Sequence, residues 1–491
     1  MRLAQLKIHD APGPLLPSLK QLRVIGPNEL SISQLSLFFS ESLQTVEANS
    51  VPKEQQAAFL SFLITLIGEA PLLSTIKLGP GSFTASCLNT CLKFDHLRHL
   101  ELVDAALSID FDFLIAVGGL PELKNFILNA RTATYMSPPV VILKQEVLSD
   151  PPLPTLDGGH PIGSLLGAPS PPFANSTPIL PTNTSLFGPV NNQSPSDPDG
   201  AAPVGHFSRL RRLDVIGSFS LIEDLYKYVI SVDLERLEMT LVHKSTKIKK
   251  SSPSPSTIKL PATSKIDSEI DSFFALVKNA VEQKWPLTLK GVHLGHFQDF
   301  KVLNLNGYVD PLPVSIPFET FTILLKHGIL EDLEIAGWTV PYSSDKKHPI
   351  DQVLQATLPN LKLFHLPIGG PTPGVQIDQL LPIVRAFPKL VSLQCGLEQP
   401  WTSIPLTPAA SVPLHGLKVL SVGHQNSNID QKQQIRIASF LDILFPNLEC
   451  IKTHAGHHED VWAYICELIK MCQASRLNHE DRLWSHWLPL S

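Results

Sequence analysis

Residues 94–102, FDHLRHLEL, and residues 120–128, LPELKNFIL, carry the same apolar pattern. In each stretch a leucine, Leu97 or Leu123, is followed three residues later by a second apolar residue and two residues after that by an aliphatic one. The last two apolar positions flank a single residue, and this alternation is typical of a strand with one buried and one exposed face.

The pattern recurs thirteen times along the chain, often directly after Leu-Pro or Phe-Pro. First leucines are separated by 24, 30, 24 and 26 residues in the first five copies and by 31, 29, 27 and 31 residues in the last five. A Leu-rich amphipathic helix produces single matches by chance, but thirteen matches in near-register favour a repeat. The first leucines are Leu19, Leu43, Leu73, Leu97, Leu123, Leu210, Leu234, Leu289, Leu330, Leu361, Leu390, Leu417 and Leu448.

Stretches with helical spacing and capping residues lie between the copies. A strand followed by a helix in every copy must return the chain in parallel, and stacking such units buries apolar faces that one unit leaves exposed. The sequence therefore predicts an α/β solenoid. Examples of the expected helices are residues 51–70, 267–283, 317–327, 376–387 and 430–444.

This pattern resembles the leucine-rich repeat family in its long, irregular form. The resemblance implies an irregular arc with parallel strands on the concave side and helices on the convex side. In that family an Asn or Cys three residues beyond the core forms a hydrogen-bonded ladder. Here Ala105, Ser218 and Trp338 stand at this position in three copies, so we expect the ladder to be absent or replaced.

Two inserts interrupt the copies. Residues 131–205 hold 15 of the 44 prolines and few aromatic residues, a composition too poor in apolar side chains to offset the ordering entropy. The second insert carries a run of lysines followed by SSPSPS, which suits either a nuclear-localisation or phosphorylation-gated patch or a solvated loop, and we favour the loop. The expected organisation is N-terminal leucine-rich repeats at 1–130, a disordered Pro-rich insert at 131–205, repeats at 206–242, a disordered Lys/Ser/Pro insert at 243–265, C-terminal repeats at 266–458, and a capping helix (459–471) with a loosely packed polar tail at 459–491.

The composition disfavours several classes of partner. Charged residues make up 17% of the chain and the net charge is -6, which gives no electrostatic reason to expect nucleic acid or a membrane surface. No apolar run approaches the roughly 18 residues of a membrane span, and the first residues lack the apolar core of a signal peptide. The six cysteines contain no CxxC pair, as expected in a reducing compartment. We expect a cytoplasmic, or nuclear, protein.

The richest cluster of titratable residues is His454, His457, His458, Glu459 and Asp460. Its spacing matches no HExxH or Cys/His signature, and its place after the last strand suits a turn and a helix N-terminus. The sequence contains no GxSxG, Walker A or dinucleotide fingerprint. We therefore expect no enzyme, cofactor or metal, and an enzymatic alternative would require this cluster to bind a metal.

Residues that flank the second and third apolar positions are expected to line the concave face. They mix positive and negative charge, as a protein-recognition face would, although any solvent-facing strand needs polar residues as well. The candidate protein-binding residues are Arg23, His99, Glu101, Arg212, Asp214, Arg236, Glu238, Asp332, Glu334 and His365.

The Leu/Phe-Pro-x-Leu strands, the long spacing and the Pro-rich inserts look like the repeat half of fungal F-box proteins. In that family an F-box docks the Skp adaptor and a cullin ubiquitin ligase, while the repeats select the substrate. This sequence enters its first copy by Leu16 without a visible F-box. We expect the substrate-recognition part of such an adaptor, with a protein ligand or ubiquitination substrate as partner, and with Skp and cullin only if an F-box exists upstream. The alternative is a repeat scaffold or signalling regulator, such as a small-GTPase regulator, unrelated to ubiquitin.

Overall fold

A computed structural model describes most of the repeat-bearing sequence, and all of the described residues belong to one compact unit that excludes residues 139–204. The second expected insert and the cluster at His454–His458 fall largely outside them. The described residues are 16–25, 35, 38–79, 84–103, 108–131, 134–136, 206–244, 263–299, 302–304, 307–309, 314–340, 353, 356, 358–367, 374–398, 415–424, 429–453 and 459–487.

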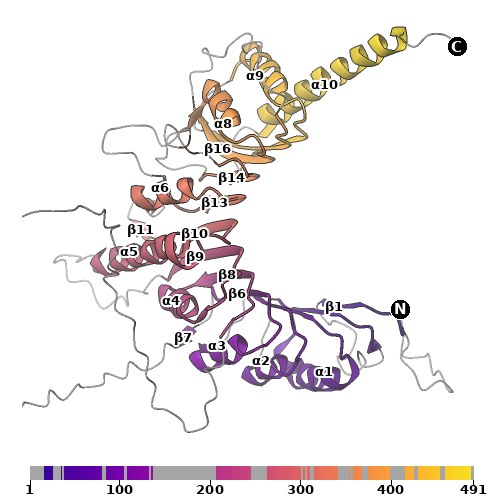
Figure 1. The fold of residues 1–491 in the computed structure, drawn as a ribbon, viewed down its shortest axis with the longest axis vertical. Coiled ribbons are helices and arrows are strands. Elements are labelled where there is room, and N and C mark those ends of the chain that lie inside the picture. Colours follow the sequence, from indigo (N-terminus) through magenta and orange to yellow (C-terminus); the bar gives the residue numbers. More distant parts are fainter. Residues whose placement is uncertain are drawn as a thin grey trace, which may run out of the picture. The chain divides into compact units, whose positions relative to one another are not determined.

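A 14-stranded sheet runs through the unit, and every pairing within it is parallel (Figure 1). This confirms the expected α/β class. In spatial order the strands are β1 (Gln21–Ile25), β2 (Thr45–Asn49), β3 (Thr75–Leu78), β4 (His99–Val103), β6 (Asn125–Asn129), β8 (Arg212–Gly217), β9 (Arg236–Lys244), β10 (Gly291–Asp299), β13 (Asp332–Ala336), β14 (Leu363–His365), β16 (Ser392–Glu398), β17 (Val419–His424) and β18 (Cys450–Thr453), with β15 (Val375–Gln376) beside β16. Two small sheets pair β5 (Ser108–Asp110) with β7 (Thr134–Met136) and β11 (Val302–Asn304) with β12 (Gly307–Val309).

Each of the thirteen leucines singled out in the sequence is followed two residues later by the first residue of a strand of the large sheet. Leu97, for example, precedes β4, and Leu123 precedes β6. Both leucines are almost completely buried, as are the second and third apolar residues of their copies. The apolar side chains therefore set the register of the sheet, because a shift by one residue would expose all of them.

The backbone repeats the same arrangement at the start of each strand. The carbonyl of Lys20 accepts hydrogen bonds from the N–H groups of Gln44 and Thr45, at 2.9 and 3.0 Å. The corresponding carbonyl of each later strand of the series accepts two N–H groups from the next one in the same way. Polar backbone groups are thus satisfied where the chain enters the sheet.

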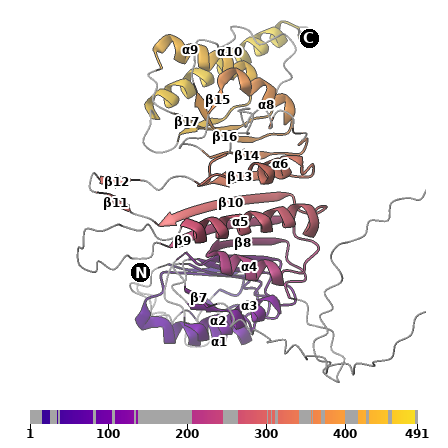
Figure 2. The ribbon, with the colours of Figure 1, turned by 90° about the vertical axis from the view of Figure 1, so that its left-hand side faces the viewer.

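Helices connect most of the strands and lie on one side of the sheet (Figures 1 and 2). They cover the face onto which the apolar strand residues point. The helices are α1 (Gln56–Glu69), α2 (Ala85–Cys91), α3 (Phe111–Gly118), α4 (Phe219–Tyr228), α5 (Thr263–Asn279), α6 (Phe318–Lys326), α8 (Leu380–Ala386), α9 (Gln431–Leu444) and α10 (Glu459–Trp487). A helix lies at each of the five ranges expected from the sequence, and the cap residues of α6 and α9, Pro317 and Asp430, are the first residues of their expected ranges.

Short polar side chains fix the beginnings of several helices. Asp110 accepts the N–H of Phe113 at 2.9 Å and caps α3. Asp430 accepts the N–H of Gln433, whose side chain binds back to the Asp430 N–H, and this capping box starts α9. Such caps satisfy N–H groups that have no partner within the helix.

The C-terminal end differs from the expectation of a short capping helix and a loose tail. Helix α10 continues to Trp487, and residues of the expected tail bind the preceding elements. The Gln473 amide donates to the carbonyls of Pro446 and Leu448, and Arg476 pairs with Asp442 on α9 at 2.7 Å. These contacts extend the helix through a polar segment whose composition alone suggested a tail.

The ends of the second expected insert also belong to regular elements. β9 extends through Lys244 and α5 begins at Thr263. Of the second expected insert, residues 245–262 therefore lie outside the described part. Of the three positions where the leucine-rich repeat family has Asn or Cys, Ala105 is not described, Ser218 precedes α4, and Trp338 is buried.

Candidate interaction surface

The sheet face opposite the helices carries two rows of partly exposed side chains. Alternate residues of a strand point to opposite faces, so the first and third residues of each strand share this face. We call them the first row and the second row. The structure places His99, Arg212, Arg236 and Asp332 in the first row, and Arg23, Glu101, Asp214, Glu238, Glu334 and His365 in the second row.

The N-terminal part of the second row alternates in charge. Arg23 lies 3.1 Å from Glu47 on the next strand, and Lys77 lies 2.9 Å from Glu101. His99 in the first row lies 3.4 Å from the same Glu101 carboxylate. Burial would raise the pKa of Glu101, but the bonds from Lys77 and then His99 outweigh it and hold that pKa below its usual range. Opposite charges on neighbouring strands stabilise each other, although exposed pairs contribute only about 0–1 kcal/mol.

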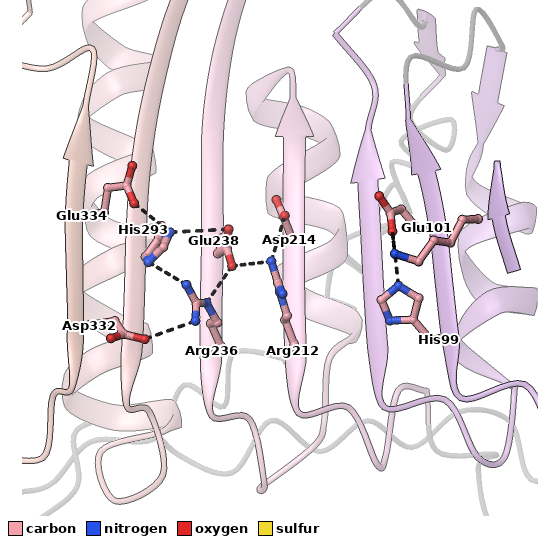
Figure 3. Close-up of polar contacts among 10 residues, drawn as sticks. His99, Glu101, Arg212, Asp214, Arg236, Glu238, His293, Asp332 and Glu334 are labelled. Atoms are coloured by element: carbon pink, nitrogen blue, oxygen red, sulfur yellow. Dashed lines mark hydrogen bonds and ion pairs between the residues drawn. The ribbon is translucent and has the colours of Figure 1, made fainter. Parts of the chain in front are cut away.

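The central part, on β8, β9, β10 and β13, is a connected network (Figure 3). The Glu238 carboxylate receives Arg212 at 2.8 Å and Arg236 at 2.7 Å. Arg236 also reaches Asp332 at 3.1 Å. Each arginine bridges strands. Arg236 uses Nε, Nη1 and Nη2, whereas Arg212 reaches Glu238 and Asp214 from Nη2.

His293 occupies the second row on β10, between Glu238 and Glu334 (Figure 3). Its Nε2 lies 3.0 Å from Nη2 of Arg236, and because a guanidinium only donates, Nε2 is the acceptor. The proton of the neutral ring therefore lies on Nδ1, which is 3.5 Å from Glu238 and 3.4 Å from Glu334. The imidazole thus links two carboxylates and one arginine.

The pKa values of the two carboxyl groups on β8 and β9 are shifted in opposite directions. Burial, and then the negative charge of Glu238, raises the pKa of Asp214 to about 6. Burial would also raise the pKa of Glu238, but the contact with His293 and the charges of the two arginines outweigh it and lower that pKa to about 2. The pKa values of two carboxylates that share a site diverge in this way when one of the carboxylates contacts most of the cations.

His365 continues the second row on β14. Its Nε2 lies 2.9 Å from the Ser392 hydroxyl, and its Nδ1 lies 3.7 Å from Glu334. Hydrogen bonding to His365 lowers the pKa of Glu334. All ten candidate residues therefore lie on this one face. Nine of them pair with another candidate, while Arg23 pairs with Glu47, which was not a candidate.

Sequence reasoning missed four ionisable members of the second row: Glu47, Lys77, His293 and Lys452. They occupy the same place in their copies as Glu101 and Glu238, between the second and third apolar positions. Carrying this position through every copy would have found them. The copy at Leu123 places Ile127 here, which interrupts the charged row.

Other candidate features add little to this surface. Among the described residues, no group of three or more His, Cys, Asp or Glu side chains is arranged to hold a metal ion, and the histidines of the His454–Asp460 cluster lie outside that part. Nor does that part contain a helix with the length and apolar character needed to cross a membrane. Glu459 and Asp460 lie in the first turn of α10. Comparison with protein-family models and with curated proteins finds no match to this chain.

Proposed function

We propose that the chain is a leucine-rich-repeat solenoid that binds another protein through the sheet face opposite the helices. We call this face, which carries the first and second rows, the outer face. The coincidence of thirteen pattern leucines with thirteen parallel strands supports the repeat assignment. The expected arc, with this face on the concave side, belongs to the same proposal.

The observation that carries the binding proposal is the network on β8, β9, β10 and β13. Arg236, Glu238 and His293 hold one another in fixed positions at 2.7–3.5 Å. Charged side chains that are already ordered lose little conformational entropy when a partner binds, and their pattern of charge selects that partner. The face thus presents a preformed set of donors and acceptors, without requiring catalysis, a cofactor or a metal.

Within this class, the substrate-recognition part of an F-box-type ubiquitin-ligase adaptor is our first assignment. It rests on the resemblance of the repeat arrangement, and it requires an F-box that this sequence does not display. The second candidate is a scaffold or signalling regulator that uses the same face without ubiquitin. Both involve a protein partner rather than nucleic acid or membrane, and both place the protein in the cytoplasm or nucleus.

The binding proposal is tested by charge reversal on the outer face. Asp332→Lys changes the net charge of the first row by two units. Asp271→Lys makes the same change of net charge on the exposed side of α5. We expect cross-linking mass spectrometry on the tagged full chain to place partners on β8–β14, and Asp332→Lys alone to abolish these cross-links. Equal loss in both variants, or cross-links confined to the helices, would contradict the proposal.

A separate measurement decides between the two candidates. Co-purification of a Skp adaptor in stoichiometric amount, with ubiquitination of the cross-linked partner, would support the adaptor. Cross-links on the outer face without any Skp adaptor would leave the scaffold as the function of this face.

A further inference from the structure

Two histidines meet on the helix-covered side of the sheet, near the carboxyl ends of β9 and β10. These two strands are longer than the repeat pattern requires. Nδ1 of His243 lies 3.1 Å from Nε2 of His296, and the two rings are nearly perpendicular, with 5.3 Å between their centres. The network on the outer face does not include them.

Aromatic rings pack beside His296. His296 stacks on Trp338 with 4.3 Å between ring centres and 18° between planes, and Trp338 in turn contacts Phe273 and Phe274 on α5. His243 is 6% exposed. An imidazolium in such surroundings is costly unless a negative charge or a hydrogen-bond acceptor compensates it.

The hydrogen bonds fix which nitrogen of each neutral ring carries the proton. His296 bonds the backbone of Gly337, and this bond raises the pKa of the ring, so the ring N–H donates to a carbonyl. Because Nε2 of His296 faces His243, the donor to Gly337 is Nδ1, and Nε2 is an acceptor. His243 therefore donates from its own Nδ1, and its Nε2 carries a lone pair.

That lone pair faces a carboxylate. Nε2 of His243 is buried without a hydrogen bond and lies 3.5 Å from Oε2 of Glu269 on α5. A charge-assisted N–H···O bond is shorter, about 2.7–2.9 Å. The present distance fits a neutral ring, in which neither atom has a proton to offer the other.

We propose that His243 is a proton-binding site between β9 and α5: one solvent proton adds to Nε2 of His243, and the resulting imidazolium donates to Glu269 from Nε2 and to His296 from Nδ1. His296 stays neutral. A proton on Nε2 of His296 would instead confront the N–H of His243 and break the bond between the rings.

The charged groups around the pair agree with this assignment. Burial lowers the pKa of His243, and the charge of Glu269 opposes that effect. Burial, and then His243, lowers the pKa of His296 to about 4. Lys265, exposed on α5, lies 3.9 Å from Glu269. The segment after β13 contributes Gly337 and Trp338, which do not titrate.

The proton acts on a defined place in the chain. His243 is near the end of β9 and Glu269 is near the start of α5, so the new ion pair joins the two elements that flank residues 245–262. Acid still destabilises the fold through these two histidines, because their pKa values in the folded state lie below the ordinary value and the unfolded chain binds protons first. Glu269 reduces that loss, so the new ion pair limits the weakening of the contact between β9 and α5 as the pH falls and does not reverse it.

The test is a pH titration of the histidine rings in the full chain, labelled with ¹⁵N at histidine and followed by long-range ¹H–¹⁵N correlation. His243→Gln and His296→Gln identify the two sets of signals. We expect the bare nitrogen of neutral His243 to be Nε2, and we expect His243 to become imidazolium at a higher pH than His296.

Glu269→Gln should lower the titration midpoint of His243 by about 0.5–1 pH unit, since an opposite charge at this distance shifts a pKa by roughly 1–3 units and Glu269 is partly exposed. Asp271→Asn removes the same charge from an exposed position on α5 and should leave the midpoint unchanged. A bare Nδ1 on His243, earlier protonation of His296, or equal shifts in the two variants would overturn the assignment. Circular dichroism of both variants checks that the fold is intact.

Discussion

Arg236 on β9 reaches Asp332 on β13 across the full width of β10, with 3.1 Å between Nη1 and Oδ2. The register places Gly291 directly between the two residues. A Cβ at this position would lie 3.1 Å from Cγ of Arg236. The absence of a side chain at Gly291 therefore leaves room for the arginine to lie across the strand.

We predict that Gly291→Val displaces Arg236 and uncouples it from Asp332. A double-mutant cycle with Arg236→Met and Asp332→Asn, measured by urea denaturation, should give a coupling energy of about 0.5–1 kcal/mol in the native chain. The same cycle repeated in the Gly291→Val background should give a coupling energy near zero. The pair Arg212–Glu238 does not cross Gly291 and serves as the control, because its coupling should survive. An unchanged coupling for Arg236 would show that the arginine does not need the space above Gly291.

Asp214→Asn should stabilise the protein near pH 7 by about 1 kcal/mol and have little effect near pH 4. The pKa of Asp214 is raised to about 6, so the stability that its proton provides is complete below about pH 3.8 and is lost as the pH rises through about 6. The amide removes the charge that causes this loss. Denaturant midpoints at both pH values check the prediction, and equal effects at the two would contradict it.

Glu238→Gln should have the opposite sign and destabilise the protein near pH 7. The pKa of Glu238 is lowered to about 2, so its contribution is present above about pH 4.5 and is lost as the pH falls toward about 2. The same denaturation series measures it. A stabilising effect at pH 7 would mean that desolvation outweighs the bonds from Arg212 and Arg236.

Gly337→Ala should destabilise the fold by at least about 2 kcal/mol. Gly337 has φ +74°, and a Cβ there would lie 2.1 Å from the carbonyl oxygen of His296. Gly328→Ala is the control, since a Cβ at Gly328 would meet nothing within 4 Å. Thermal unfolding compares the two variants, and similar midpoints would contradict the role given to the close approach at Gly337.

Arg476→Met should loosen the C-terminal half of α10. Asp442 is 9% exposed, and without Arg476 its carboxylate would lose this ion pair at a cost of about 1–3 kcal/mol. Hydrogen exchange of α10 after Met471 should accelerate. Lys470→Met removes a cation that pairs within the helix, with Glu467, and should leave exchange nearly unchanged. Equal acceleration in the two variants would mean that the contact with α9 does not hold this part of the helix.

The sequence predicts the strands well because the leucine pattern directly reports which side chains are buried. It does not predict the length of β9 and β10, since the pattern ends before His243 and His296, and so it does not reveal their contact. The sequence predicts which positions form the two rows. It does not predict the bond between Arg236 and Asp332, because that bond passes over Gly291, a residue of a third copy. The helix beyond Met471 was missed because Gln473 and Arg476 form their bonds to distant residues.

The doubly accepting carbonyls at the strand starts have a consequence for how this chain can change in length. The carbonyl of Lys124 receives the N–H groups of Arg211 and Arg212 just as the carbonyl of Arg98 receives those of Lys124 and Asn125. Yet the copies that begin at Leu123 and Leu210, which the Lys124 carbonyl connects, lie 87 residues apart. The copies that begin at Leu97 and Leu123, which the Arg98 carbonyl connects, lie only 26 residues apart. Loop closure adds only about 0.6 kcal/mol for each doubling of loop length. The order of side chains along the rows therefore depends on the order of the copies, so insertions and deletions between them can accumulate over evolution while the outer face keeps its sequence of charges.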